Sequence, residues 1–174
     1  MQGLIHIYCG EGKGKTTAAV GLGVRACGSG MRVVLAQFLK GNSSGERRVL
    51  ERLPGFFLIP GPESVKFTFQ MTPREMEEAR RQSGAMLRAA VETARRETCG
   101  LLILDEVFGA VSTGVLQAED VLNFLRGKPE ALEVVLTGRD PAPEFLQLAD
   151  YVSEIRKIKH PYDRKVPARK GIEY

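Results

Sequence analysis

The feature that most constrains the fold is a glycine-rich segment that joins an apolar run to a helical pattern. Residues 4–9 are mostly apolar and predict a short buried strand, and GEGKGKTT follows at residues 10–17. A helix is predicted from Lys15 to about Cys27. A strand that runs through glycines into a helix is typical of phosphate-binding loops, because backbone N–H groups and the helix dipole attract anions there. The sequence therefore favours an α/β fold built around such a loop.

Further strands and helices alternate along the chain. Thr72-Pro73-Arg74-Glu75 forms a capping box with proline at the first helical position, and it opens a long polar helix. This alternation indicates a mostly parallel sheet with helices on both faces. The predicted strands after the first cover residues 32–38, 56–59, 101–104, 133–137 and 151–155, and the predicted helices after the first cover residues 73–97, 119–125 and 143–148.

The composition fits one globular domain over residues 1–174, with 43% hydrophobic and 26% charged residues. No apolar run has the length of a membrane span, and the N-terminus lacks a signal-peptide pattern, so we expect a cytoplasmic protein. Three cysteines without a CxxC pair and two histidines predict neither a disulfide framework nor a protein-supplied metal cluster. The net charge of +4 suits an anionic small molecule and is weak support for nucleic-acid binding.

Polar residues follow four of the predicted strands at the point where each strand ends. GEGKGKTT follows the first strand, Lys40-Gly41 the second, Asp105-Glu106 the strand at residue 101, and Thr137-Gly138-Arg139 the strand over residues 133–137. Ligands of open α/β sheets bind beyond the carboxyl ends of the strands. Glycine, lysine, threonine, acidic residues and arginine at these ends predict a polyphosphate and metal site.

The glycine-rich loop is the centre of that predicted site. Lys15 supplies a positive charge, and the Thr16 hydroxyl is placed to bind Mg²⁺. The loop departs from the GxxxxGK[ST] pattern, because the first glycine of that pattern falls on Cys9 and the loop is one residue shorter. The competing interpretation is a glycine-rich turn that binds no ligand. The predicted nucleotide-binding residues are Gly10, Glu11, Gly12, Lys13, Gly14, Lys15, Thr16, Thr17 and Arg139.

Three further candidates have open alternatives. Asp105 and Glu106 would help to hold Mg²⁺, and Glu106 is either a general base for water or a second metal ligand; a solvated strand end is the plain alternative. Arg139 is either a phosphate contact or a surface arginine. Phe67 and Phe69 alternate as in a strand, which predicts one shared face, in the core by default or as a platform for a flat ligand.

Longer matching segments point to a family. GEGKGKTTAAVG, AQFLKG followed by Gly45-Glu46, LLILDE, VVLTGR, LADYVSEI, KHPYD and GIEY occur in this order over nearly the whole chain. In this set the chain resembles the P-loop type of ATP:corrinoid adenosyltransferase. The resemblance implies that a corrinoid reduced to Co(I) attacks the 5′ carbon of ATP and releases triphosphate. It also implies Mg²⁺ or Mn²⁺, a homodimer, and an electron donor such as a reduced flavoprotein.

The resemblance assigns roles to particular residues. It implies that Lys15 and Thr16 contact the triphosphate and the metal, that Glu106 is the magnesium carboxylate with Asp105 beside it, and that Arg139 contacts phosphate. The catalytic residues it implies are Lys15 and Glu106. Phe67 and Phe69 take the place of a phenylalanine and a tryptophan that lie near the corrinoid and displace its lower axial ligand. Family members often carry an N-terminal extension over the site, and we expect this lid to be missing or replaced here.

Two other functions compete with this one. An ordinary P-loop ATPase or small-molecule kinase would use Glu106 as a base and release ADP. A module that binds ATP or a corrinoid without turnover would act as a carrier or sensor. No membrane or nucleic-acid partner is expected.

Overall fold

Six parallel strands form one sheet in the computed structural model, which describes residues 2–62 and 66–173. The strand order is β3-β2-β4-β5-β1-β6, and each pair of neighbours is parallel. The sheet is the mostly parallel one that the sequence predicts. The strands are β1 (Ile5–Cys9), β2 (Val33–Gln37), β3 (Phe56–Leu58), β4 (Leu101–Asp105), β5 (Glu133–Thr137) and β6 (Tyr151–Glu154).

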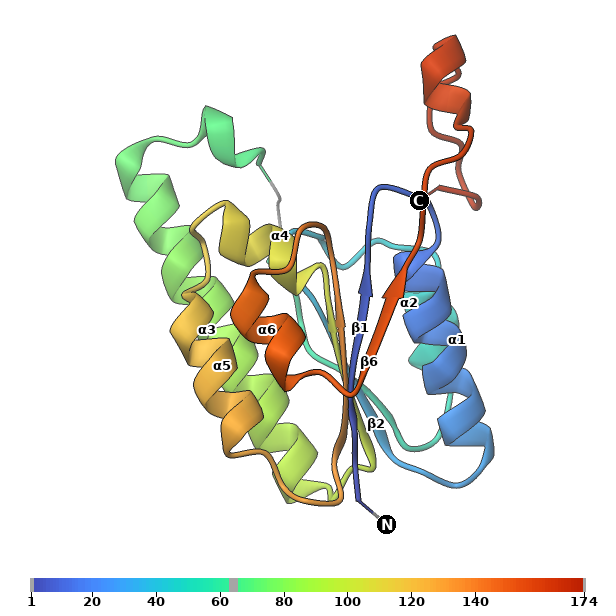
Figure 1. Ribbon diagram of the computed structural model, residues 1–174, viewed down its shortest axis with the longest axis vertical. Coiled ribbons are helices and arrows are strands. Elements are labelled where there is room, and N and C mark those ends of the chain that lie inside the picture. Colours follow the sequence, from blue (N-terminus) through green and yellow to red (C-terminus); the bar gives the residue numbers. More distant parts are fainter. Residues whose placement is uncertain (1, 63–65, 174) are drawn as a thin grey trace.

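Helices cover both faces of the sheet, as predicted (Figure 1). On one face lie α1 (Lys15–Gly28) and α2 (Arg47–Leu50). The other face carries α3 (Pro73–Arg96), α4 (Val107–Ser112), α5 (Ala118–Arg126) and α6 (Pro143–Leu148). Two short 3₁₀ helices, η1 (Thr68–Gln70) and η2 (Pro161–Arg164), lie in segments that extend beyond the end of the sheet where the strands terminate.

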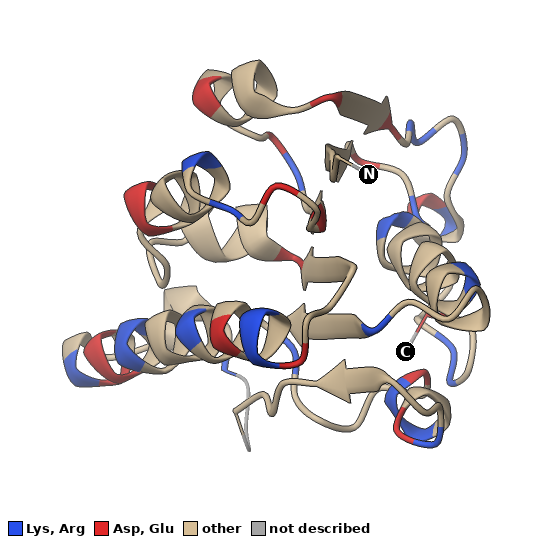
Figure 2. Ribbon diagram, turned by 90° about the horizontal axis from the view of Figure 1, so that it is seen from below, with Lys and Arg blue, Asp and Glu red and all other residues tan. Residues whose placement is uncertain are grey.

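The hydrophobic core is divided between the two faces. All five residues of β2 and all five of β4 are buried, which is usual for central parallel strands covered on both sides. One cluster joins the sheet to α3, α4, α5 and α6 and includes Phe108 packed edge-to-face on Phe145. The other cluster joins the sheet to α1 and α2. Figure 2 shows Lys, Arg, Asp and Glu mainly on helices and loops, so the sheet itself is the apolar centre.

The long helix begins as the sequence predicts. Thr72 Oγ1 accepts a hydrogen bond from the Glu75 N–H, and the Glu75 carboxylate accepts one from the Thr72 N–H, so the capping box is complete. None of the helices in the described ranges has the length and apolar character to cross a membrane.

The sequence-based prediction was wrong at one segment and missed several short ones. Phe67 and Phe69 lie beside and in the 3₁₀ helix η1, and not in the strand-like conformation that their alternation resembles. The helix α4 was not predicted, because it has six residues and follows β4 after a single residue, Glu106, in the left-handed conformation (φ 58°). The four-residue helix α2 was also missed, since so short an element carries little periodicity.

Candidate functional site

The phosphate loop connects β1 to α1 and folds around the Lys15 side chain. Lys15 Nζ donates hydrogen bonds to the carbonyl oxygens of Gly10 (2.6 Å) and Gly12 (2.8 Å). Gly10 and Gly14 have φ angles of 102° and 120°, which only glycine adopts easily. The Gly12 N–H donates to the Ile155 carbonyl (2.7 Å), so the loop is anchored to the chain that follows β6.

Charged groups from other strand ends surround Lys15. Burial lowers the pKa of Lys15 below its usual 10.5, and the positive charge of Arg139 lowers it further. The nearby carboxylates of Glu106 and Glu11 oppose these effects and raise the pKa. The predicted residues that follow β1, β4 and β5 therefore lie close enough to act on one ammonium group.

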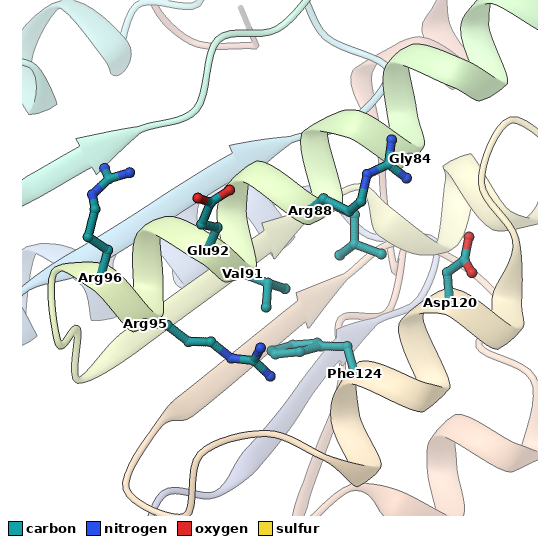
Figure 3. A pocket seen from close by; sticks show the side chains of 9 residues that line it. Gly84, Arg88, Val91, Glu92, Arg95, Arg96, Asp120 and Phe124 are labelled. Carbon is teal, nitrogen blue, oxygen red and sulfur yellow. The ribbon is translucent and has the colours of Figure 1, made fainter.

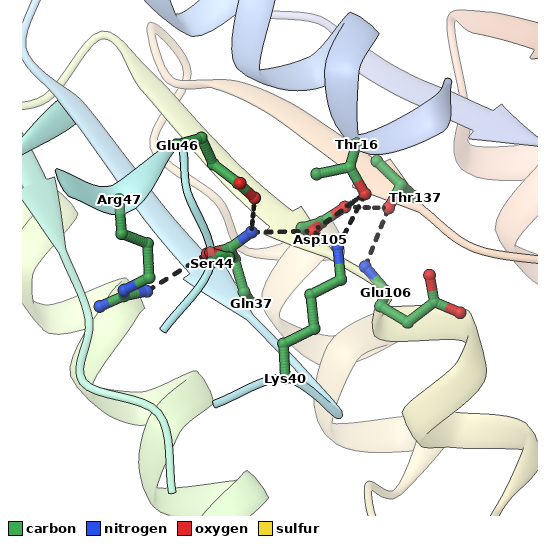
Figure 4. A network of polar contacts seen from close by, with 9 residues as sticks. All are labelled: Thr16, Gln37, Lys40, Ser44, Glu46, Arg47, Asp105, Glu106 and Thr137. Carbon is green, nitrogen blue, oxygen red and sulfur yellow. Dashed lines mark hydrogen bonds and ion pairs between the residues drawn. The ribbon is translucent and has the colours of Figure 1, made fainter. Parts of the chain in front are cut away.

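Asp105 is the centre of a buried polar network at the same edge of the sheet (Figure 4). Its side chain is fully buried, and Oδ1 accepts hydrogen bonds from Thr16 Oγ1 (2.9 Å) and Thr137 Oγ1 (2.7 Å). Lys40 Nζ lies 2.8 Å from Asp105 Oδ2 and 2.9 Å from Thr16 Oγ1. The register explains this convergence, because β2, β4 and β5 are adjacent and end together.

Glu106 lies beside this network and differs from Asp105 in orientation. Its backbone N–H donates to Thr137 Oγ1 (2.8 Å), while its carboxylate is directed away from the Asp105 carboxylate (Figure 4). Glu106 has a left-handed backbone (φ 58°) at the point where the chain passes from β4 into α4. Asp105 and Thr16 supply adjacent oxygen ligands of the kind that Mg²⁺ and Mn²⁺ prefer. In the described ranges, no group of three or more His, Cys, Asp or Glu side chains could hold a metal by itself.

A second layer of side chains supports Asp105, and the sequence analysis assigned no role to it. Gln37 is buried at the end of β2, and its Nε2 donates to Glu46 Oε1 (2.9 Å) and Asp105 Oδ2 (3.3 Å). Arg47 is buried in α2 and donates from Nη2 to the Ile59 carbonyl (3.1 Å). Burial lowers the pKa of Arg47, and the charges of Glu51 and Glu46 oppose that effect.

The position of Lys40 at a strand end was the sequence signal that could have identified its contact with Asp105.

Arg139 and Glu11 lie at the solvent-exposed side of the loop. Their side chains form an ion pair of 2.8 Å, and each is more than half exposed. A pair this exposed contributes little to stability, so either side chain can take another partner at low cost. Both proposed roles of Arg139 remain compatible with this position.

The two phenylalanines do not pack in the core, which corrects the default interpretation of their alternation. Phe67 is 70% exposed and Phe69 81% exposed, and their rings stack with centroids 5.4 Å apart and planes 20° apart. The segment that carries them extends past the carboxyl edge of the sheet (Figure 1). The 3₁₀ turn places both rings together, so the predicted shared face is present although the backbone is not extended.

A cavity of about 850 Å³ opens between the ends of β2 and β3 and the first half of α3. Its lining is mainly apolar and includes Phe38, Leu39, Ile59 and Met86, and Lys66, next to Phe67, also borders it. A second cavity, of about 630 Å³, lies between α3 and α5 among Arg88, Arg95, Asp120 and Phe124 (Figure 3). Leu39 lines the first cavity, and the next residue in the chain, Lys40, belongs to the polar network.

Comparison with known proteins gives a consistent result. The family model described as "ATP:corrinoid adenosyltransferase BtuR/CobO/CobP" matches residues 1–174. The corrinoid adenosyltransferase of Escherichia coli K12 is 36% identical, with 99% of this chain and 86% of the relative covered. That of Pseudomonas aeruginosa is 32% identical, with 99% and 84% covered.

The fold alone is shared with more distant proteins. A KaiC-like protein from Pyrococcus horikoshii OT3 has a TM-score of 0.58 at 15% identity, with 99% of this chain and 76% of that chain covered. The sequence match extends along the entire chain, through the phosphate loop, Asp105 and the C-terminal segment alike. This chain therefore belongs to the ATP:corrinoid adenosyltransferase family.

Proposed function

We propose that this protein transfers the 5′-deoxyadenosyl group of ATP to the Co(I) centre of a reduced corrinoid and releases triphosphate. The observation that carries the proposal is the placement of a phosphate loop, a buried carboxylate and an exposed aromatic pair at one edge of the sheet. A polyphosphate and a flat apolar macrocycle are the two ligands that such neighbouring surfaces suit. Family membership makes ATP and a corrinoid the pair to test.

The reaction needs charge stabilisation more than acid–base chemistry. The electron pair of the substrate's Co(I) forms the Co–C5′ bond, the C5′–O5′ bond breaks, and its electrons leave with triphosphate. Negative charge therefore grows on the leaving group. Lys15, at present bonded to two loop carbonyls, is the ammonium that would turn to the triphosphate, together with the N–H groups of the loop. Arg139 would exchange Glu11 for a phosphate oxygen.

The residues of the polar network would hold a divalent cation. Asp105 and Thr16 fit Mg²⁺ or Mn²⁺ by donor type, and Glu106 would join them after a change of side-chain rotamer. When bound, the cation would neutralise triphosphate charge. The remaining nucleotide contacts proposed are Gly10, Glu11, Gly12, Lys13, Gly14 and Thr17.

The stacked phenylalanines and the adjacent cavity are proposed as the corrinoid-binding surface. Phe67 and Phe69 expose large apolar rings that water solvates poorly, so a macrocycle covering them would gain hydrophobic stabilisation. A phenylalanine ring placed at the lower face of the cobalt has no atom that can coordinate the metal, and it can exclude the lower axial ligand. The Co(II) form then becomes easier to reduce by an external donor, for which we propose a reduced flavoprotein. A single catalytic domain acting in a homodimer completes the proposal.

The test is product analysis. The protein is incubated in the dark without oxygen with ATP, Mg²⁺ and chemically reduced cobalamin, and the products are separated. A light-sensitive adenosylated corrinoid and triphosphate in equal amounts are expected, and Lys15→Ala should yield neither. Release of ADP and phosphate would instead indicate an ATPase or kinase, and ATP binding without turnover would indicate a binding module.

A further inference from the structure

Lys40 contacts both oxygen groups that would hold the divalent cation. Its ammonium lies 2.8 Å from Asp105 Oδ2 and 2.9 Å from Thr16 Oγ1. The residue before it, Leu39, has a φ of 55°, a left-handed conformation that is unfavourable for a non-glycine residue. The chain thus leaves β2 through a strained residue and directs a lysine into the network, which indicates that this contact is built into the fold.

The ammonium balances a charge that the protein could not otherwise bury. Asp105 is 0% exposed, and within the described ranges its carboxylate forms an ion pair with Lys40. The other contacts of the Asp105 carboxylate come from neutral groups, namely the hydroxyls of Thr16 and Thr137 and the Gln37 amide. A buried carboxylate without a cation is strongly destabilising. Lys40 therefore stabilises the folded network as a counterion.

A metal ion at this site would need the same oxygen atoms that Lys40 contacts. A divalent cation bound by Asp105 and Thr16 would take oxygen lone pairs that now face the ammonium, and the two positive charges would repel each other at contact distance. The Lys40 side chain is 32% exposed, so it has an open side toward which it can move. A nearby triphosphate would offer the displaced ammonium a new anionic partner.

We propose that Lys40 and the divalent cation compete for the oxygens of Asp105 and Thr16, so that the cation binds well only together with ATP. Lys40 then moves from the carboxylate to the triphosphate and adds a second side-chain ammonium to the one supplied by Lys15. The inference concerns the proposed nucleotide site, but the competition itself needs no corrinoid and no adenosyl transfer.

The test is a titration of the full chain with Mn²⁺ in the absence of ATP. Calorimetry measures the affinity for Mn²⁺, and the melting temperature (Tm) measures the stability with and without the metal. Wild type should bind Mn²⁺ weakly and show little change in Tm. Lys40→Met removes the competing charge, so Mn²⁺ should bind at least about tenfold more tightly. Its Tm without metal should fall by about 5 °C or more because Asp105 loses its counterion, and Mn²⁺ should restore it.

Two controls make the result specific. Lys40→Arg keeps the charge and should behave as wild type toward Mn²⁺. Lys157→Met removes a lysine from an exposed ion pair with Asp163 and should change neither property. If Lys40→Met binds Mn²⁺ no better than wild type, or if Mn²⁺ does not restore its Tm, the competition is ruled out.

A double variant covers the case in which Lys40→Met folds poorly. Lys40→Met combined with Asp105→Asn removes the buried charge together with its partner, and the Tm should recover without metal while Mn²⁺ binding is lost. No recovery would contradict the counterion role. These outcomes are separate from the proposed reaction, because a protein without adenosyl transfer could still show Mn²⁺ rescue, and an active one could fail to show it.

Discussion

The Thr137 hydroxyl lies 2.7 Å from Asp105 Oδ1 and joins the ends of two neighbouring strands. It donates its proton to that carboxylate and accepts the backbone N–H of Glu106 at 2.8 Å. One hydroxyl therefore fixes both acidic residues, holding the first by its side chain and the second by its main chain. Because Thr137 is fully buried, no water can replace it without rearrangement.

Replacing Thr137 with valine should weaken this arrangement without changing its shape. The buried carboxylate would lose a donor and the Glu106 N–H its acceptor, which together cost about 1–3 kcal/mol of unfolding free energy. Metal-dependent ATP binding should weaken in parallel. Chemical denaturation and ATP titration would measure both effects. Thr137→Ser keeps the hydroxyl and should retain most of the ATP affinity; equal losses in the two variants would argue against the hydrogen bonds as the cause.

The pH dependence of ATP binding should reveal the environment of Lys15. Burial and Arg139 lower its pKa in the free protein, whereas a bound triphosphate favours the charged ammonium and raises the pKa. When ATP binds at a pH above the pKa that Lys15 has in the free protein, the Lys15 amine therefore takes up a proton. Affinity should be constant near neutral pH and should fall as the pH rises through a value below 10.5, by up to about tenfold per pH unit. Titration calorimetry in buffers of different ionisation enthalpy would detect the proton uptake.

Lys15→Arg is the matched variant for that measurement. Arginine stays charged across the accessible pH range. The loss of ATP affinity at alkaline pH should therefore disappear, even if the affinity at neutral pH is lower. An unchanged fall would assign the titration to another group. Arg139→Ala should move the fall to higher pH, because it removes a positive charge that lowers the pKa of Lys15.

Much of the fold could be predicted from the sequence, because local signals such as helix caps agree with the pattern of buried apolar residues in most of its strands and helices. The strand over residues 133–137 and the helix over residues 143–148 have the predicted bounds, and Thr72 begins α3 as its capping box predicts. Short apolar runs such as LLIL are typical of central strands in a parallel sheet, and this one forms β4. The short elements α2, α4 and η1 lie below the length at which periodicity is informative.

The sequence indicates where the polar residues gather, but it says less about which of them contact one another. The strand ends in the sequence point to the edge of the sheet where the polar network lies, since parallel strands all terminate there. Which of these ends touch depends on the strand order, in which β4 lies between β2 and β5. That order brings Lys40 and Thr137 to Asp105 from its two sides, and no local pattern encodes it. The left-handed backbone of Glu106 (φ 58°) is likewise not signalled by its sequence context.

Phe69 should affect the reduction step more than adenosyl transfer. Phe69→Ala removes a ring that is 81% exposed, so the unfolding free energy should change by no more than about 0.5 kcal/mol. If the ring excludes the lower axial ligand, turnover from Co(II) with a reductant should fall sharply while turnover from pre-reduced Co(I) is spared. Leu146→Ala, an exposed apolar residue on α6, serves as the control. Equal losses from both cobalt states would contradict the role.

The capping box should give α3 an acid-sensitive start. Hydrogen bonds from the Thr72 backbone, Lys66 and the Thr72 hydroxyl lower the pKa of Glu75 from 4.5 to about 2. The stabilisation is thus present above pH 4.5 and is lost as the pH falls toward 2. Glu75→Gln should lower the Tm at neutral pH, and its difference from wild type should shrink in acid. Glu77→Gln on the same helix should show no such pattern.

Gly12 and Gly21 provide a paired test of the loop geometry. A Cβ at Gly12 would lie 2.6 Å from the Ile155 carbonyl oxygen, a backbone atom that cannot move aside freely. Gly12→Ala should therefore push the loop off its anchor and weaken ATP binding at least about tenfold, with the sheet intact. A Cβ at Gly21, inside α1, meets nothing within 4 Å, so Gly21→Ala should stabilise the protein by about 0.5–1 kcal/mol. ATP titration and denaturant unfolding measure the two effects separately. If Gly12→Ala bound ATP normally, the contact with the segment after β6 would not shape the loop.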